Sequence, residues 1–436
     1  MATHCARKHF AALREGADWA LLENAGGSQV PEQVVEHASS YFRNSYVQLG
    51  AGYEASLAAD STVASARRLV HALCSADESA GFAALGASTT CLLASLALAL
   101  EPTLSAGDVL IVSSAGHESN VGPWVRAAAR TGARLLFWHP EGDHGEDTCP
   151  LSGLRRLLAD EAGRAVRLVA FPHVSNLLGG TTDVAAIAEL ARRAGALSVC
   201  DGVAYAPHRR VDAAQWKVDF YAFSLYKVYG PHMAVLFGLH GAWERILREG
   251  AEPPNHYFVL TADNTDAPWY AWEAGGVSHE ACAAVCGLRE YMRVLAGIEG
   301  TDDVAVVNAA FEAMTSLEAP VQELMAAFFI AEHRAGRLRL VGPASADAAV
   351  RVPTFSFVPL GGATPGSVVA ACHAARVAVR SGHMYAVRLC EQLGIILEAG
   401  AFGRGSGVVR VSAVHYNTTA EAQRCIDAIA SALALA

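Results

Sequence analysis

Apolar runs alternate with amphipathic segments between about residues 60 and 240. The runs 108–112 and 167–171 are almost wholly apolar, whereas 187–193 carries apolar residues at helical spacing and is closed by Gly195, a typical helix end. Apolar strands between amphipathic helices are typical of a mainly parallel sheet that is covered on both faces. We therefore predict an α/β fold. The predicted strands are 108–112, 134–138, 167–171, 196–200, 220–223 and 234–237, and the predicted helices are 92–100, 124–130, one that begins at 154–158, and 187–193.

The alternating pattern stops after residue 250. Residues 250–276 are rich in Pro, Asn, Asp and Gly, which indicates a long connection that carries site residues. A long helix is predicted over 280–296, and 303–436 reads as a smaller α+β lobe, beside which the first fifty residues pack. We predict an amino-terminal segment 1–50, a large domain 51–276, and a linking helix with a small domain 277–436.

Composition narrows the functional class. The chain of 436 residues is 52% hydrophobic and 17% charged, as in a compact enzyme, and its formal net charge of -10 without a basic run argues against nucleic acid binding. The ten cysteines form no Cys-x-x-Cys pair, so we expect no disulfide framework, no metal site and a reducing cytoplasm. The amino terminus lacks a signal peptide, and the most apolar helix, 91–100, is too short for a membrane span.

Two residues at predicted strand ends indicate a cofactor. The run 196–200 is followed by Asp201, and the run 220–223 is followed by Ser224, Leu225, Tyr226 and Lys227. A pyridoxal 5'-phosphate (PLP) enzyme needs a lysine for the Schiff base and an aspartate that keeps the pyridine nitrogen protonated. We therefore predict PLP as the cofactor.

Other strand ends supply further candidates, because ligands bind at the carboxyl ends of the strands in open α/β sheets. His117 follows one strand and is predicted to stack on the cofactor ring. Asn176 follows another and can donate to the phenolic oxygen of the cofactor or to a substrate carboxylate. Arg410 stands between apolar residues, where either a substrate carboxylate or a structural salt bridge would pair with it.

A phosphate site is predicted at the start of the helix 92–100. Ser88, Thr89 and Thr90 precede this helix, and hydroxyls with free N–H groups at a helix start bind phosphate. Taken alone, this segment favours the alternative interpretation of an ordinary N-cap. Ser224 and Tyr226 are predicted to add further donors to the phosphate.

Taken together, these motifs resemble the class V aminotransferase group of fold-type I PLP enzymes, and within it the cysteine desulfurase-like branch. The resemblance implies a mostly parallel seven-stranded sheet with a smaller α+β carboxy-terminal domain, and a homodimer whose active site lies at the subunit interface. It also implies the roles given above to Lys227, Asp201 and His117, and an α-carboxylate bound by Arg410. The segments that carry the resemblance are 24–29, 117–124, 173–179, 201–202, 224–231, 380–383 and 409–418.

Departures from the family pattern bear on the reaction. Tyr385 stands where desulfurases of this branch carry the persulfide cysteine, two residues after His383, and Cys390 lies five residues further on. Asp201 is followed by Gly-Val-Ala without the glutamine of the family. The Gly-Thr phosphate contact from the partner subunit corresponds to the pair Gly275 and Gly276 here. These changes argue against sulfur transfer, which requires a thiolate.

The strings 88–92, 201–204 and 255–259 resemble one subset of the family, the decarboxylative aldolases typified by ustiloxin biosynthesis. This resemblance implies β-decarboxylation of L-aspartate and addition of the product to an aldehyde, giving a γ-hydroxy amino acid.

Alternatives are a C–S lyase that uses Cys390, transamination or epimerisation, and a regulatory protein that only binds PLP. Tyr385 would contact the substrate either as a passive part of the pocket lining or as an acid/base group. Candidates for binding a β-carboxylate are Arg380, His383, His256 and His173.

Overall fold

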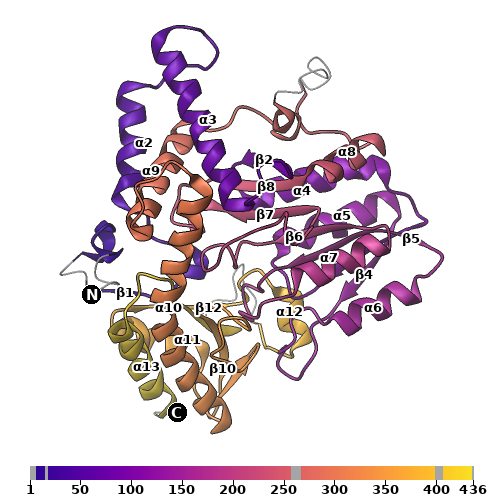
Figure 1. The fold of residues 1–436 in the computed structure, drawn as a ribbon. Coiled ribbons are helices and arrows are strands. Elements are labelled where there is room, and N and C mark those ends of the chain that lie inside the picture. The colour runs from indigo at the N-terminus through magenta and orange to yellow at the C-terminus, as the bar shows by residue number, and fades with distance from the viewer. Residues whose placement is uncertain (1–5, 15–17, 257–266, 398–405, 435–436) are drawn as a thin grey trace.

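The computed structural model describes residues 6–14, 18–256, 267–397 and 406–434. Its largest sheet has seven strands in the order β2-β8-β7-β6-β5-β3-β4. Neighbouring strands pair in parallel except β8, which is antiparallel to β2 and β7. The predicted mainly parallel α/β fold is confirmed (Figure 1). The strands are β2 (Gly81–Gly86), β3 (Asp108–Ser113), β4 (Arg134–Trp138), β5 (Ala165–Pro172), β6 (Leu197–Asp201), β7 (Phe220–Ser224) and β8 (Ala234–Leu239).

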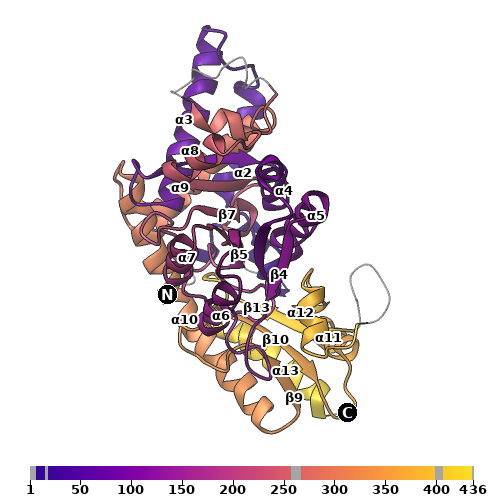
Figure 2. The ribbon, with the colours of Figure 1, turned by 90° about the vertical axis from the view of Figure 1, so that its right-hand side faces the viewer.

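Alternate residues of the central strands enter two different hydrophobic cores. In β3, Val109 and Ile111 belong to one core, and Leu110 and Val112 belong to the other. Side chains alternate along a strand, so a strand with helices on both faces has no polar side. Figure 2 shows α4 and α5 on one side of the strands and α7 on the other. The helices over the first core are α3 (Glu54–Cys74), α6 (Leu151–Asp160), α7 (Val184–Arg193) and α9 (His279–Ala296), and those over the second are α4 (Thr89–Leu100), α5 (Gly122–Thr131) and α8 (His240–Arg248).

A long helix, α10 (Asp303–Arg334), joins the large sheet to the carboxy-terminal lobe (Figure 1). This lobe holds an antiparallel sheet in the order β12-β13-β10-β9, so the predicted α+β character is confirmed. The domain boundaries at residues 50 and 276 stay predictions. The remaining elements are β9 (Leu338–Val341), β10 (Thr354–Pro359), α11 (Pro365–Ala374), β11 (Val377–Ala378), β12 (Arg380–Gly382), α12 (Val387–Gln392), β13 (Val408–Ser412) and α13 (Thr419–Ala434).

The amino-terminal segment contacts both lobes. Its short strand β1 (Ala20–Leu21) pairs in parallel with β11 of the small lobe, and Glu23 forms an isolated bridge with Ser412 at the end of β13. Its helix α2 (Glu32–Asn44) packs against α9. These contacts place part of the first fifty residues beside the small lobe, with residue 23 next to β13.

Some sequence expectations need adjustment. The strand β2 was not predicted, because its sequence Gly-Phe-Ala-Ala-Leu-Gly is rich in residues that disfavour strands.

Gly195 ends the predicted helix, with a φ of 73° just after α7. In the described ranges, no helix is long and apolar enough to cross a membrane, and the nine cysteines present there are free thiols.

Candidate active site

A pocket opens where β3, β5, β6 and β7 end. The lining residues are Thr89, Thr90, His117, Ser119, Pro172, Val174, Asn176, Asp201, Val203, Ala204, Ser224, Tyr226 and Lys227. Parallel strands bring their carboxyl ends to the same edge of a sheet, which is why residues more than a hundred positions apart meet here. The structure thus brings the predicted strand-end residues together in one cavity.

Lys227 supplies a primary amine to this pocket. The chain has only three lysines, and Lys8 and Lys217 are exposed whereas Lys227 is buried, in a 3-10 turn (Leu225–Lys227) after β7. Burial, aided by the positive charge of Arg410, lowers the pKa of Lys227 to about 8. A substantial fraction of the amine is therefore neutral near physiological pH, as a nucleophilic lysine requires.

This pKa predicts how the apoenzyme regains its cofactor. Because only the neutral amine attacks the aldehyde of PLP, the rate of reconstitution should rise about tenfold between about pH 7 and about pH 9 and then level off. Stopped-flow absorbance of the bound cofactor measures this rate, and Nα-acetyllysine treated in the same way corrects for titration of PLP itself. A rate that still rises steeply at about pH 10 would show a lysine with an ordinary pKa and contradict the prediction.

Asp201 ends β6 beneath the same pocket and is buried. Burial raises the pKa of Asp201 to about 6, while the N–H of Val203, which donates to Oδ1 at 3.0 Å, and the charge of Lys227 act in the opposite direction. A buried carboxylate with one backbone donor has remaining capacity for a cationic partner. A protonated pyridine nitrogen is such a partner.

His117 presents a neutral ring. Its Nδ1 accepts the N–H of Ser119 at 3.0 Å and lies 2.8 Å from Ser119 Oγ, so the neutral ring carries its proton on Nε2. Burial and the charges of Lys227 and Arg410 lower the pKa of His117 to about 3. An uncharged ring held in one tautomer is suited to stacking on an aromatic cofactor. Sequence reasoning overlooked Ser119, although the His-x-Ser spacing was a signal for it.

The start of α4 forms the polar end of the pocket. The first N–H groups of a helix have no intrahelical partner and attract a phosphate, and Thr89 and Thr90 line the pocket at this point. The Thr89 and Ser224 hydroxyls are 2.7 Å apart. Burial raises the pKa of Tyr226, which keeps its hydroxyl protonated as a donor. These groups fit the phosphate of PLP.

Ser88 serves another purpose. Its Oγ accepts the N–H of Cys91 at 3.1 Å and so caps α4, and Ser88 is not among the residues that line the pocket. The N-cap interpretation therefore describes Ser88, and its contact with phosphate stays a prediction.

Asn176 is fixed by the small lobe. Its Nδ2 donates to the carbonyl of Met384 at 2.7 Å, and its buried Oδ1 has no hydrogen-bond partner among the described residues. The predicted donation to a phenolic oxygen or a carboxylate would use the second hydrogen on Nδ2. The orphaned Oδ1 adds an acceptor that the sequence did not suggest, and a ligand that donates there would remove its desolvation cost.

Arg410 lies on β13, directly opposite Arg380 of β12. Its side chain is 3% exposed, Nη1 donates to the carbonyl of Asn176 at 3.2 Å, and Nε has no partner in the described part of the chain. Burial lowers the pKa of Arg410 to about 10, so the group stays charged at neutral pH. Glu23 approaches at 3.4 Å, which is longer than a well-formed salt bridge. Arg410 therefore retains capacity for an incoming carboxylate.

The turn 383–385 of the small lobe contacts two residues of the pocket, His117 and Asn176. Met384 and Tyr385 have φ angles of 49° and 61°, which is costly for residues with side chains. The N–H of Glu118 donates to the Tyr385 carbonyl at 2.9 Å, and the Tyr385 N–H donates to His383 Nδ1 at 3.0 Å. These contacts place the Tyr385 ring 5.1 Å from that of His117. His383 is thus engaged in holding the turn, and substrate roles for His383 and Tyr385 stay predictions.

Two other histidines, His173 and His256, were candidates for the second cation. The ring of His173 stacks on Tyr205 at 3.5 Å and Nδ1 lies 2.8 Å from the Tyr221 hydroxyl, while burial moves the pKa of His173 well below its usual value. His173 is therefore a neutral core residue. His256 is exposed, and part of the string 255–259 lies outside the described residues.

Cys390 is buried and does not line the pocket. It lies in α12 with no exposed surface, among the apolar residues of a separate small core. Burial raises the pKa of its thiol to about 12. No cysteine lines the pocket around Lys227 in the described part of the chain.

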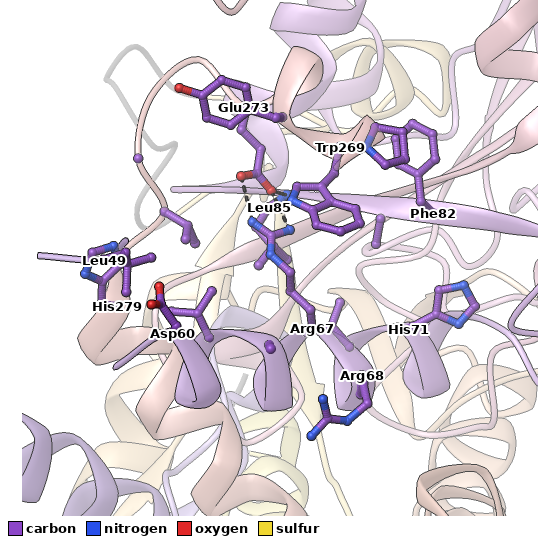
Figure 3. Close-up of a pocket in the computed structure, with 18 of the residues that line it drawn as sticks. Leu49, Asp60, Arg67, Arg68, His71, Phe82, Leu85, Trp269, Glu273 and His279 are labelled. Carbon is purple, nitrogen blue, oxygen red and sulfur yellow. Dashed lines mark hydrogen bonds and ion pairs between the residues drawn. The ribbon is translucent and has the colours of Figure 1, made fainter. Parts of the chain in front are cut away.

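Gly276 lies elsewhere, beside a second hollow of about 970 Å³ between β2, α3 and the 268–277 loop (Figure 3). There Glu273 accepts two hydrogen bonds from Arg67, at 2.9 and 2.8 Å, and a third from the Leu85 N–H. Arg67 also lies over the ring of Trp269 (Figure 3). Gly276 therefore does not line the cofactor pocket of its own chain.

The fold and the pocket define a PLP-dependent enzyme. The class V aminotransferase family model matches residues 20–425, and the chain belongs to that family. It is 35% identical to the aminotransferase-like protein FGM3 of Gibberella zeae over 417 residues, 93% of each chain. It is 31% identical to the cysteine desulfurase-like protein ustD of Aspergillus flavus, over 59% of this chain and 56% of that one. The apo cysteine desulfurase of Thermococcus onnurineus shares the fold, with a TM-score of 0.80 and 22% identity over 99% of this chain and 98% of that one.

Proposed function

We propose that this enzyme breaks and forms bonds at the β-carbon of an acidic amino acid. The favoured reaction is β-decarboxylation of L-aspartate followed by addition to an aldehyde, which yields a γ-hydroxy amino acid. The observation that carries this proposal is the replacement of the persulfide cysteine by Tyr385 in a turn fixed against His117, with the nearest later thiol, Cys390, buried. Partial similarity to ustD supports it.

The side chains of the pocket have distinct tasks in this reaction. PLP supplies an electron sink when it is bound. Lys227 would hold the cofactor and would move protons, for which a pKa of about 8 is well placed. Asp201 would keep a proton on the pyridine nitrogen, and the ring of His117 would pack against the cofactor. Arg410 binds the α-carboxylate through its free Nε and an Nη group.

Arg380 is the second cation that this proposal needs. It faces Arg410 across the two strands, and its side chain is 36% exposed, so a substrate can reach it. Two guanidinium groups on adjacent strands can bind the two carboxylates of one small dicarboxylic amino acid.

Mass spectrometry of the products tests the proposal. The PLP-loaded enzyme is mixed with L-aspartate and an aromatic aldehyde, and with L-cysteine in a parallel reaction. A γ-hydroxy amino acid, or alanine without the aldehyde, would support chemistry at the β-carbon of aspartate. Oxaloacetate or D-aspartate would instead indicate transamination or epimerisation, and no product from aspartate would refute the proposal.

The second candidate is a C–S lyase, favoured by the structural similarity to cysteine desulfurases. If L-cysteine releases sulfide, Cys390→Ser should leave the rate within about twofold of wild type, because a buried thiol with a pKa of about 12 supplies no thiolate. Sulfide release is measured colorimetrically, with Cys425→Ser, a buried cysteine of the small lobe, as the matched control. A selective loss in Cys390→Ser would show that α12 rearranges to expose the thiol.

We also infer that two copies of the chain assemble around shared active sites. A Cβ added at Gly276 would meet nothing within 4 Å in one chain, yet the family resemblance places this glycine against the phosphate bound by the partner. Gly276→Phe should therefore leave the melting temperature of the apoenzyme unchanged but weaken PLP binding about tenfold or more through steric exclusion. Gly241→Phe, at another open position, is the control. Equal PLP affinity in both variants would contradict the shared site.

A further inference from the structure

Glu23 places one carboxylate oxygen close to Arg380 and Arg410, the two arginines proposed above to bind carboxylates. Its Oε1 lies 3.4 Å from Arg380 Nη1 and 3.4 Å from Arg410 Nη2. The two arginines are register partners on β12 and β13, so their guanidinium groups share this single anion. Glu23 itself comes from the amino-terminal segment, far away in the sequence.

The fold fixes the backbone of Glu23 but leaves its side chain room to move. Its backbone is bridged to Ser412, and the adjacent Asn24 donates through Nδ2 to the Ser412 carbonyl at 2.9 Å. The carboxylate rests against Gly26, where the three atoms nearest to an added Cβ all belong to the Glu23 carboxyl group. The Glu23 side chain is 33% exposed, so it can swing toward solvent.

The three groups are close enough to the reacting amine to affect it. Arg410, Glu23 and Arg380 all contribute to the pKa of Lys227, with the carboxylate opposing the two guanidinium groups. Two cations and one anion leave a net positive charge of one, which matches a single substrate carboxylate. A second carboxylate at Arg380 would have to displace Glu23 Oε1, which lies 3.4 Å from Arg380 Nη1.

We propose that Glu23 is a specificity-determining residue that occupies the second carboxylate position of the active site. A monocarboxylic ligand binds at Arg410 and leaves Glu23 on Arg380. A dicarboxylic ligand binds only when Glu23 swings away, and Glu23 thereby reduces the affinity for dicarboxylates. This inference rests on the proposed use of Arg410 and Arg380 as carboxylate sites.

Ligand binding without turnover tests this role. Calorimetry on the PLP-loaded enzyme compares succinate with propionate, neither of which has an amine that can react. In Glu23→Gln, which keeps the shape but removes the charge, the succinate Kd should fall at least about tenfold, and the propionate Kd should change less than about threefold. Asp18→Asn removes a charge from the same segment at an exposed pair with Arg376 and should change neither.

Gly26→Ala provides a second variant that keeps the Glu23 charge. Gly26 has no left-handed φ, so the backbone tolerates alanine, and the added Cβ would displace the Glu23 carboxylate, which holds the three nearest atoms. Succinate binding should tighten in this variant as well, and a series from malonate to adipate should show one preferred length. Equal tightening for propionate, or for every dicarboxylate length, would show a general charge effect and overturn the proposal. Because no turnover is involved, the result is independent of whether aspartate is decarboxylated.

Discussion

Lys227→Ala is expected to lower turnover of any amino acid substrate by about 10³-fold or more and to abolish the visible absorbance of covalently held cofactor. The variant removes both the attachment point of PLP and the proton carrier, and proton transfer by a positioned side chain alone contributes about 10²–10⁴-fold. Neither of the other two lysines can take its place, since Lys8 and Lys217 are exposed and lie outside the pocket. The measurements are kcat from product mass spectrometry and an absorbance spectrum after gel filtration.

Lys217→Asn is the matched control for this loss. Lys217 is exposed and has a φ of 54°, a conformation that asparagine tolerates, so the variant should keep wild-type activity and absorbance. Lys227→Arg keeps a positive charge without a nucleophilic amine and should be as inactive as Lys227→Ala. Substantial activity in Lys227→Arg would show that the charge at this position, rather than its amine, is what the reaction needs.

The fold could be predicted from the sequence where local pattern and sheet rules suffice. The run before Asp201 and the run before Lys227 are apolar on both faces, and parallel strands place their ends together. Local pattern failed for β2, whose alanines and glycines resemble a loop, and gave no sign that α10 continues through Pro320. Packing against neighbouring strands and helices stabilises both elements, despite the weak strand propensity of β2 and the internal proline of α10.

The site residues also fall into two groups: those that the local sequence indicates, and those that depend on contacts between distant segments. His117 and Lys227 were found because each follows a strand. Glu23 was missed because its partner Arg410 lies 387 residues away, and only the pairing of the amino-terminal segment with the small lobe brings them together. His173 became a candidate because it follows β5, whereas in the structure its ring packs against Tyr205 in an aromatic cluster. Side-chain direction at a strand end is set by tertiary packing.

Asp201→Asn should have the second largest effect, a loss of about 10²–10³-fold in kcat. Asparagine retains the acceptor for the Val203 N–H but carries no charge, so it no longer keeps a proton on the pyridine nitrogen. The cofactor then becomes a poorer electron sink while Lys227 still binds it. The expected signature is therefore low kcat with nearly normal cofactor content, which separates this variant from Lys227→Ala. Asp183→Asn is the control: it replaces one favourable N-cap residue of α7 by another and should leave kcat and cofactor content unchanged.

The pH dependence of cofactor affinity gives an independent test of Asp201. Burial raises its pKa to about 6, so the carboxylate of the apoenzyme is ionised above this pH and protonated below it. The affinity of the apoenzyme for PLP should accordingly fall as the pH drops through about 6, and the affinity of Asp201→Asn should lack this step. Fluorescence titration of apoenzyme with PLP measures both. An unchanged acidic step in Asp201→Asn would assign the titration to another group and remove the main electrostatic argument for Asp201 as the partner of the pyridine nitrogen.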